Sequence, residues 1–319
     1  MVRVLITGAA GNLGSHLARH LMGRVSLDFR LRLMIHKKDL PFPLPESPFV
    51  ESVKADLASP ATLDPACEGV DCLVHFAGVL FAPNPEAFLP TTNTVYAGNL
   101  VDAALRARVR RFILISFPHV EGETAPGRLA NGTLEGNPVS VHAQTRLKAE
   151  QYLFKAYQGA ELEPVALRPG MIYGKNILMV DAAKFLAQSR LLAVWKKPTW
   201  IHLISIDDFL ECVRVAIEKP GIWGVYNLGD EKAVTLQQFL DKASERWRCA
   251  KPVRLPEWCF YAVAWLCETF ASIFRTRSPL TMDFIRIGMV SYASDTSRMK
   301  RELLETLKYP TLSEGIQIL

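Results

Sequence analysis

Short apolar runs alternate with helical patterns through the first half of the chain. Between the runs, in segments such as residues 12–22 and 91–108, apolar residues recur three and four positions apart, which is the spacing of one helix face. This alternation predicts βαβ units, and therefore a parallel sheet with helices on both faces. The expected strands are VRVLI from Val2, LRLMI from Leu31, CLVHF from Cys72, FILIS from Phe112 and PVALR from Pro164.

The pattern loosens after about Gly170, where strand-like pieces such as residues 225–228 stand among helical ones. We therefore expect an α/β chain with a Rossmann-type, doubly wound parallel sheet and a smaller, mostly helical C-terminal substrate domain. The dinucleotide-binding domain is expected over residues 1–170, with returns near 204–230, and the substrate-binding part over 171–203 and 231–319. Four prolines within residues 39–48 predict a loop between the second and third strands.

Composition limits the classes of partner and the cellular compartment that we expect for this chain. About half of the 319 residues are hydrophobic, and the formal charge of +5 comes from scattered basic residues, so we expect a large core and no nucleic-acid partner. The six cysteines show neither a CxxC pair nor metal-ligand spacing, which predicts no metal site and a reducing, cytoplasmic setting. The apolar run at the start of the chain is too short for a signal peptide.

The longest apolar stretch runs from Trp258 to Phe274 and is interrupted by Glu268. It falls short of the ~20 apolar residues that cross a bilayer. We interpret it first as a helix that covers a substrate cavity. Its aromatic side chains and the flanking Arg254 and Arg275 leave two alternatives open, namely peripheral membrane contact through residues 258–274 and a homodimer interface.

A glycine-rich turn follows the first expected strand. Gly8, Gly11 and Gly14 are spaced as G-x-x-G-x-x-G, and an amphipathic helix begins directly after them. Glycines let the backbone approach a pyrophosphate closely, and a helix N-terminus offers free N–H groups and a positive dipole. This turn, with Asn12 and Leu13, is therefore the candidate pyrophosphate-binding site of a dinucleotide cofactor.

Further motifs follow the later strands. They are Asp56-Leu57, His75-Phe76-Ala77-Gly78, Asn93, Arg168-Pro169-Gly170, Ile206-Asp207-Asp208 and the ending Tyr309 to Gly315. Together they make nearly the whole chain resemble the extended short-chain dehydrogenase/reductase family, on the side of its NAD-dependent epimerase/dehydratase and 3β-hydroxysteroid dehydrogenase-like branches. The resemblance implies an NAD(P)-binding Rossmann fold. It also implies cofactor contacts at Asp56, Leu57, Phe76, Ala77, Gly78, Asn93 and Pro169.

The end of the second strand indicates which cofactor is preferred. It reads Met34-Ile35-His36-Lys37-Lys38, with an acid only at Asp39. A carboxylate at this point would accept a hydrogen bond from a ribose 2′-hydroxyl, whereas cations accommodate a 2′-phosphate. His36 and Lys37 are therefore candidate contacts, and we expect NADP(H) to be favoured over NAD(H).

The catalytic motif departs from the family pattern of a tyrosine and a lysine four residues later. Aligning the chain on Ala149-Glu150 places His142 at the tyrosine position and Arg146 at the lysine position, where Arg146 would also contact the cofactor. Aligning it on Lys148 places Gln144 at the tyrosine position instead. Neither register supplies a tyrosine.

The family's oxygen-binding serine or threonine is altered as well. Its position falls on Phe117, and Ser116 lies one residue early, so that Ser116 serves only if the turn is rearranged. Among other candidates, His119 and Glu121 are expected to face solvent, and His202 is expected to be structural. Tyr173 is expected either to reach the nicotinamide pocket or to be packed in the core.

These substitutions leave two interpretations open. In the first, His142 is an alternative acid–base group, because imidazole titrates near neutrality, while Arg146 disfavours the imidazolium form. Such a site suits hydride delivery to an already activated acceptor, such as a conjugated, quinoid or iminium system. In the second, the redox chemistry is lost, and the chain is a silent dinucleotide-binding accessory protein or a non-redox isomerase or dehydratase.

The C-terminal part indicates the substrate class. Its apolar segment is rich in bulky aromatic groups, whereas a sugar nucleotide would need several polar groups and cations, of which this segment offers few. This region resembles most closely the 3β-hydroxysteroid dehydrogenase branch, which implies a lipophilic substrate, sterol-like, isoprenoid or aromatic and typical of secondary metabolism. The aromatic residues are Trp258, Phe260, Tyr261, Trp265, Phe270 and Phe274.

Overall fold

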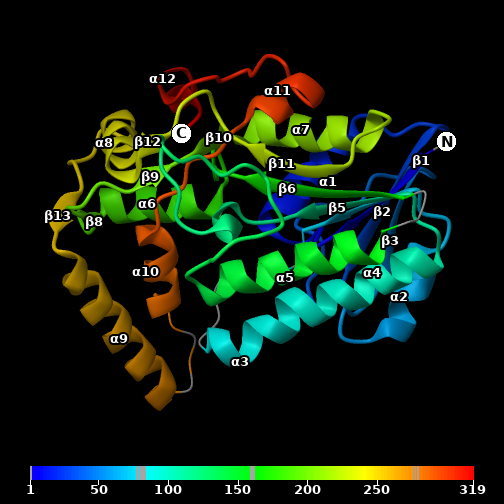
Figure 1. The fold of residues 1–319 in the computed structure, drawn as a ribbon, viewed down its shortest axis with the longest axis horizontal. Helices are drawn as coiled ribbons and strands as arrows, with labels where there is room; N and C mark the ends of the chain where they lie inside the picture. Colours follow the sequence, from blue (N-terminus) through cyan, green and yellow to red (C-terminus); the bar gives the residue numbers. More distant parts are fainter. Residues whose placement is uncertain are drawn as a thin grey trace.

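A seven-stranded parallel sheet forms the centre of the protein (Figure 1). The computed structural model describes residues 2–76, 78, 84–158, 162–274, 276, 278 and 280–319. The strand order is β11-β6-β5-β4-β1-β2-β3, and each neighbouring pair is parallel. The order reverses between β1 and β4, as in a doubly wound sheet, which confirms the predicted fold class. The strands are β1 (Val2–Thr7), β2 (Phe29–Ile35), β3 (Val50–Lys54), β4 (Cys72–His75), β5 (Arg111–Ile115), β6 (Glu163–Pro169) and β11 (Gly224–Leu228).

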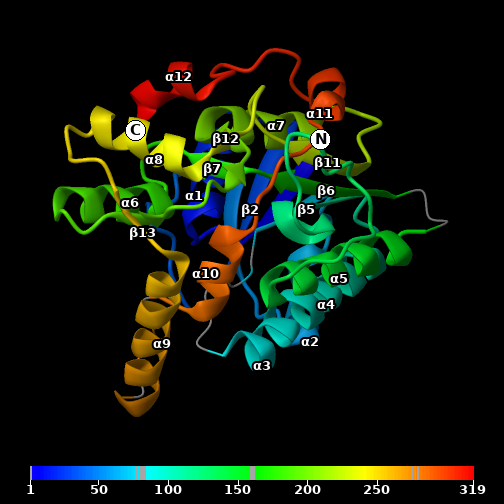
Figure 2. The ribbon, with the colours of Figure 1, turned by 60° about the vertical axis from the view of Figure 1, so that its left-hand side comes forward.

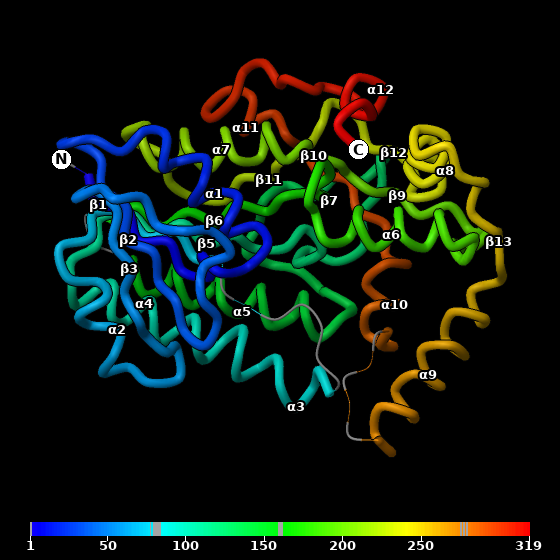
Figure 3. The backbone as a smooth tube through the Cα atoms, turned by 180° about the vertical axis from the view of Figure 1, so that it is seen from behind, coloured from blue at the N-terminus to red at the C-terminus, as the bar shows by residue number. Residues whose placement is uncertain are grey.

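Helices cover both faces of this sheet, and Figure 3 shows the same layers from behind. One core layer contains Val4 and Ile6 of β1, and the other contains Leu5 between them. Both layers are needed because the strands of a parallel sheet are buried on both sides, as their continuous apolar runs predicted. The first layer lies under α1 (Asn12–Met22) and α7 (Ile206–Glu218), and the second lies under α2 (Pro60–Cys67), α4 (Tyr96–Arg106) and α5 (Val141–Ala156).

The helix expected over residues 91–108 is present, with an irregular first half. α3 (Pro85–Leu89) leads into a π-helical segment, η1 (Pro90–Val95), which continues directly into α4. Asn93 is buried within this segment. A π-turn changes the direction of the side chains it carries and is frequent at functional sites. Here it aims Asn93 at α5.

The remaining elements lie mostly beside the carboxyl ends of the strands of the central sheet. β7 (Met171–Tyr173) pairs with β10 (Leu203–Ser205), β9 (Trp200–Ile201) with β12 (Val234–Thr235), and β8 (Ala193–Trp195) with β13 (Val253–Leu255). β11 joins the main sheet beside β6, within the expected return. The helical segments are α6 (Leu178–Gln188), α8 (Leu236–Arg246), α9 (Glu257–Phe274), α10 (Met282–Met289), α11 (Ser297–Glu302), α12 (Leu312–Gly315), η2 (Pro118–Glu121) and η3 (Ile316–Ile318).

Helix α9, which contains the long apolar stretch, projects away from the body of the molecule (Figures 1 and 2). Of its side chains, only Ala264 and Ala271 are buried. Its neighbour along the chain is α10, against which it packs. Over the ranges that the structure describes, no helix has both the length and the apolarity to cross a membrane.

Candidate functional site

The glycine turn joins β1 to α1 in a conformation that depends on its glycines. Gly8 has a φ of +73°, which favours glycine, and its carbonyl accepts a hydrogen bond of 2.8 Å from the N–H of Gly11. A Cβ on Gly14 would lie only 2.2 Å from the Gly8 oxygen. No side chain caps the start of α1, and its first turn contains no acidic residue. The first backbone N–H groups of the helix, at Asn12 and Leu13, therefore suit an anion.

The side chain of Asn12 contacts the protein itself. Its Nδ2 donates to the carbonyl of Asn176 at 2.7 Å, and its Oδ1 accepts from the N–H of Leu178 at 3.2 Å. Asn176 has a φ of +60° and follows β7. Asn12 thus ties the glycine turn to the loop that begins the C-terminal part of the chain.

The two residues expected to contact the adenosine end of the cofactor face each other across β2 and β3. His36 Nε2 and Asp56 Oδ2 are 3.3 Å apart, and both side chains are exposed. Lys37 is also exposed. The backbone of the next residue, Leu57, is held by a bond of 2.9 Å from Asn99 Nδ2 to its carbonyl. The structure therefore brings together an imidazole and a carboxylate that belong to separate motifs of the sequence.

The ends of β1 and β4 lie side by side and bring the glycine turn next to the exit of β4. Thr7 Oγ1 and His75 Nδ1 are 2.7 Å apart, and the N–H of Phe76 donates to the Thr7 carbonyl at 3.2 Å. Burial, and secondarily Arg146, lowers the pKa of His75 to about 3, so this imidazole is neutral. Phe76 packs edge-on against Phe209 of α7.

Two other candidate cofactor residues lie at strand ends, and one lies outside the described residues. Pro169 is buried at the end of β6, where it pairs with Leu228 of β11. Gly78 follows β4 and lies directly under the guanidinium of Arg146, as described next. Ala77 lies outside the residues that the structure describes.

Arg146 is the buried cation of the site. Its guanidinium packs on Gly78, where an added Cβ would lie 2.1 Å from Nη2. The side chain is only 7% exposed, and within the described part of the chain its buried Nη1 has no hydrogen-bond partner. Burial lowers the pKa of Arg146 to about 10, and Glu150, one helical turn further along α5, opposes that shift. A charged donor in such a position is costly unless a ligand accepts from it.

His142 lies one turn before Arg146, in the first turn of α5, and is buried. Asn93 Nδ2 is 3.3 Å from His142 Nδ1, and the ring of Phe117 stands edge-on to the imidazole at 4.6 Å between centroids. When an amide N–H donates to Nδ1, the neutral ring carries its proton on Nε2. Asn93 thus supports the histidine.

The geometry distinguishes the two possible registers of the catalytic motif. His142 and Arg146 are buried on the face of α5 that meets the sheet ends, whereas Gln144 and Lys148 are exposed. Gln144 donates to the carbonyl of Pro138 through its Nε2. The alignment that places His142 and Arg146 at the motif positions is therefore the one that buries both side chains, with Arg146 on Gly78 and His142 beside Asn93 and Phe117.

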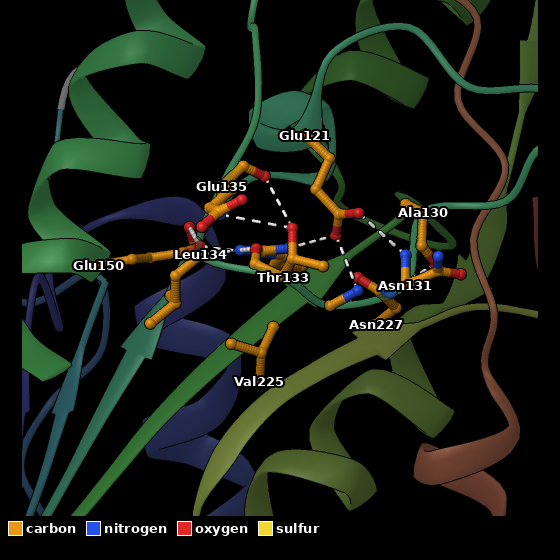
Figure 4. Close-up of polar contacts among 12 residues, drawn as sticks. Glu121, Ala130, Asn131, Thr133, Leu134, Glu135, Glu150, Val225 and Asn227 are labelled. Carbon is orange, nitrogen blue, oxygen red and sulfur yellow. Dashed lines mark hydrogen bonds and ion pairs between the residues drawn. The ribbon is translucent and has the colours of Figure 1, made fainter.

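Ser116 belongs to a buried ionic network rather than to the surroundings of His142. Its hydroxyl donates to Glu150, and Glu150 also accepts from Arg168 Nη2 at 2.5 Å. Arg168 bonds Glu121 as well, and its Nη2 donates to the carbonyl of Thr133 at 2.7 Å. Figure 4 shows Thr133 lying between Glu150 and Glu121. This network, defined by Ser116, Glu121, Glu150 and Arg168, fixes the loop that precedes α5.

Two expectations about the turn after β5 were wrong. Glu121 does not face solvent, because its carboxylate is 10% exposed and accepts from the N–H groups of Asn131 and Gly132. His119 contacts the Val290 carbonyl at 3.1 Å, and burial lowers its pKa to about 4. The turn is covered by residues around Tyr292, from the far end of the chain.

Tyr173 and His202 are structural residues in this fold. Tyr173 is fully buried and packs against Gly315, where an added Cβ would lie 1.9 Å from the tyrosine hydroxyl. Of the two expectations for Tyr173, the one that places it in the core is therefore confirmed. His202 Nε2 is 2.8 Å from the Asp230 carbonyl, and its Nδ1 accepts from the Ser294 N–H at 3.2 Å. This confirms the structural role expected for His202.

Sequence reasoning missed Asp283 of α10. It is buried, and its carboxylate meets the backbone of Val141 and His142 at the start of α5. Burial raises the pKa of Asp283, while hydrogen bonds from those two backbone groups oppose the shift. An isolated acid in an apolar segment gives no signal of such a role, because the contact spans about half of the chain. Asp283 thus joins the C-terminal part to the helix that carries His142.

The described residues fit a bound dinucleotide in two independent ways. The turn from Gly8 to Gly14 is a cradle that a Cβ would fill, and it leads into an uncapped helix N-terminus. Arg146 places an unpartnered buried donor at the exit of β4, beside that cradle. Gly8, Gly11 and Gly14 would hold the phosphates, and Arg146 would reach the part of the cofactor near His142.

Known proteins agree with this fold. Residues 4–229 match the family model described as NAD dependent epimerase/dehydratase family. The chain is 28% identical over 252 residues to an Arabidopsis thaliana trifunctional UDP-glucose 4,6-dehydratase/UDP-4-keto-6-deoxy-D-glucose 3,5-epimerase/UDP-4-keto-L-rhamnose-reductase, a match covering 72% of this chain and 37% of that protein. The chain therefore spans well under half the length of the curated relatives it matches first.

Two further similarities cover most of both partners. A ceramide reductase of Caulobacter vibrioides is 27% identical over 280 residues, 86% of this chain and 80% of that protein. The solved structure of MoeE5 in complex with UDP-glucose and NAD superposes with a TM-score of 0.77 at 18% identity, covering 99% of this chain and 96% of that one. The glycine cradle, the parallel sheet and the extent of the match lead to one conclusion: the chain belongs to the NAD-dependent epimerase/dehydratase family.

Proposed function

We propose that the protein is an NAD(P)H-dependent reductase of a lipophilic acceptor, a conjugated carbonyl or quinoid compound or a sterol- or isoprenoid-like molecule. The observation that carries this proposal is the pair His142 and Arg146, buried on one face of α5. Arg146 presents a donor at the exit of β4 that has no partner among the described residues, and Asn93 supports the imidazole of His142. A merely structural pair would have its polar atoms satisfied inside the protein, as those of Arg168 are.

His142 and Arg146 have different roles in this proposal. A bound nicotinamide cofactor in its reduced form supplies the hydride that reaches the electrophilic carbon of the acceptor, and is itself oxidised. Arg146 binds the cofactor near its reactive end. The imidazole of His142 donates a hydrogen bond toward the acceptor oxygen, which takes up the electron pair and then a proton from solvent. A conjugated acceptor suits this site, because it spreads the developing charge and needs less proton transfer than a simple ketone.

Two finer features of the proposal concern cofactor and substrate. NADP(H) is favoured over NAD(H) because His36 and Lys37 stand at the end of β2, although Asp56 Oδ2 lies 3.3 Å from His36 Nε2. A lipophilic substrate is supported by similarity to a protein named ceramide reductase. The large apolar side chains of α9 add no support, because they point away from the body of the molecule. Other relatives are named for UDP-sugar chemistry, which makes a sugar nucleotide the competing substrate class.

The test is an assay of NADPH and NADH oxidation with a panel of quinoid, enone, sterol-like and UDP-sugar compounds. We expect turnover with a lipophilic acceptor, and a loss of about 10²-fold or more in His142→Ala. Gln144→Ala, exposed on the same helix, is the matched control and should retain activity. Tight cofactor binding without turnover would indicate a silent binding protein instead. Product formation without net cofactor oxidation would indicate an epimerase or dehydratase, and turnover of UDP-sugars alone would exclude a lipophilic substrate.

A further inference from the structure

Helix α9 exposes a continuous set of large apolar side chains along its whole length. α9 has 18 residues, all within the described part of the chain. Figures 1 and 2 both show it standing away from the sheet and its covering helices. The large apolar side chains on its outer face are between 50% and 69% exposed, and they are Trp258, Val263, Trp265, Leu266, Phe270, Ile273 and Phe274.

Charged groups are absent from this outer face, which the seven residues above define. α9 contains two acids and neither lysine nor arginine. Glu268 is turned toward α10, where it accepts a hydrogen bond of 2.9 Å from the N–H of Met282. Glu257 lies in the first turn, where α9 joins the body of the molecule. At 100° per residue, both acids fall on the side that also carries the buried Ala264 and Ala271, opposite the exposed residues.

The chemistry of this face suits lipid better than protein. A protein–protein interface carries about one hydrogen bond per 100–200 Å². The outer face of α9 offers few polar groups beside its apolar ones, namely the indole N–H groups of Trp258 and Trp265 and the hydroxyls of Thr269 and Ser272. In the sequence, Arg275 and Arg277 follow the helix directly, and the chain has a net charge of +5. Tryptophan and phenylalanine next to arginine are typical of helices that lie in the headgroup region of anionic membranes.

We propose that α9 docks the protein on the surface of an anionic lipid bilayer, with its outer face in the interface and its inner face still packed on α10. The aromatic pair Phe270 and Phe274, whose rings are 4.4 Å apart, would enter the interface at the free end of the helix. This inference concerns a partner rather than the reaction, so it stands or falls independently of the proposed function.

The test is co-sedimentation of the full chain, without cofactor or substrate, with phosphatidylcholine vesicles that contain or lack phosphatidylglycerol. We expect binding that needs the anionic lipid and weakens with salt. Phe270→Glu combined with Ile273→Glu should weaken it at least about tenfold. Leu27→Glu is the matched control, because Leu27 is 71% exposed outside α9, and it should bind like the wild type. Circular dichroism and cofactor affinity check that the double variant is folded.

Three results would overturn the docking proposal. The first is a wild-type chain that stays in the supernatant with both kinds of vesicle. The second is equal binding by the wild type and a folded double variant. The third is a wild-type chain that is a dimer in light scattering, does not bind vesicles, and becomes a monomer on the double substitution. That result would make α9 an interface between copies of the chain.

Discussion

Two buried arginines, Arg168 and Arg146, lie near Glu150 of α5. They differ in how fully their guanidinium groups are hydrogen-bonded by the protein. Arg168 is fully buried, and it bonds Glu150, Glu121 and the Thr133 carbonyl. Burial alone would lower its pKa, but the two carboxylates raise the pKa overall. Arg146 is almost as buried, yet its Nη1 is unpartnered within the described residues and its pKa is lowered.

The difference separates a structural charge from a charge kept for a ligand. A buried cation that is fully bonded stabilises one arrangement of the chain, and removing it leaves its carboxylates uncompensated. A buried cation with an unused donor costs free energy in the absence of a ligand and regains it when a ligand accepts. The contrast therefore predicts that substitutions of the two arginines act on different measurements, one on stability and the other on binding.

Arg168→Met should have the largest effect, on stability. It leaves Glu150 and Glu121 buried without their cation, so we expect the free energy of unfolding to fall by about 3–5 kcal/mol. Chemical denaturation monitored by circular dichroism measures this loss. Cofactor affinity of the folded fraction should change little. A loss below about 1 kcal/mol would mean that Arg168 is not the structural charge described above.

Arg146→Met should have the next largest effect, on cofactor binding. A hydrogen bond from a charged group contributes about 1.5–3 kcal/mol, so we expect Kd for the preferred cofactor to rise roughly 10- to 100-fold. The melting temperature should stay unchanged or rise, because the variant removes an unsatisfied buried charge. Calorimetric titration with NADPH and NADH gives the affinity. Lys148→Met, exposed on the same helix, is the control and should bind normally. Unaltered affinity in Arg146→Met would remove the distinction between the two arginines.

Sequence alone predicted the parts of this site that depend on local patterns. The apolar runs predicted the strands β1, β2, β4, β5 and β6, because parallel strands buried on both faces are apolar throughout. They did not indicate the edge strand β3, which carries exposed polar residues. The glycine spacing predicted the turn before α1. The contrast between Arg146 and Arg168 could not be predicted, because the partners of Arg168 lie 18 and 47 positions away and depend on how the strands cross over. The pairing of His36 with Asp56 and the projection of α9 depend on tertiary contacts in the same way.

The smallest expected effect is on the titration of His75, which reports the charge of Arg146. The folded pKa of His75 is about 3, below the ordinary 6.5, because of burial first and Arg146 second. Between pH 6.5 and about 3 the unfolded chain gains a proton that the folded chain does not, so stability falls as the pH falls through this window. Arg146→Met should raise the His75 pKa, which narrows this window and makes the acid-induced loss of stability smaller.

Nuclear magnetic resonance of the imidazole protons can follow His75 and His119 in the same sample. The pKa of His119 is also low, at about 4, but burial causes this shift without Arg146, and the hydrogen bond to the Val290 carbonyl opposes it. In Arg146→Met, His75 should therefore titrate at a higher pH than in the wild type, while His119 should not move. An equal shift of both histidines would indicate general loosening of the fold. A shift of neither would show that the charge of Arg146 does not reach the end of β4, although its guanidinium packs on Gly78 at the exit of that strand.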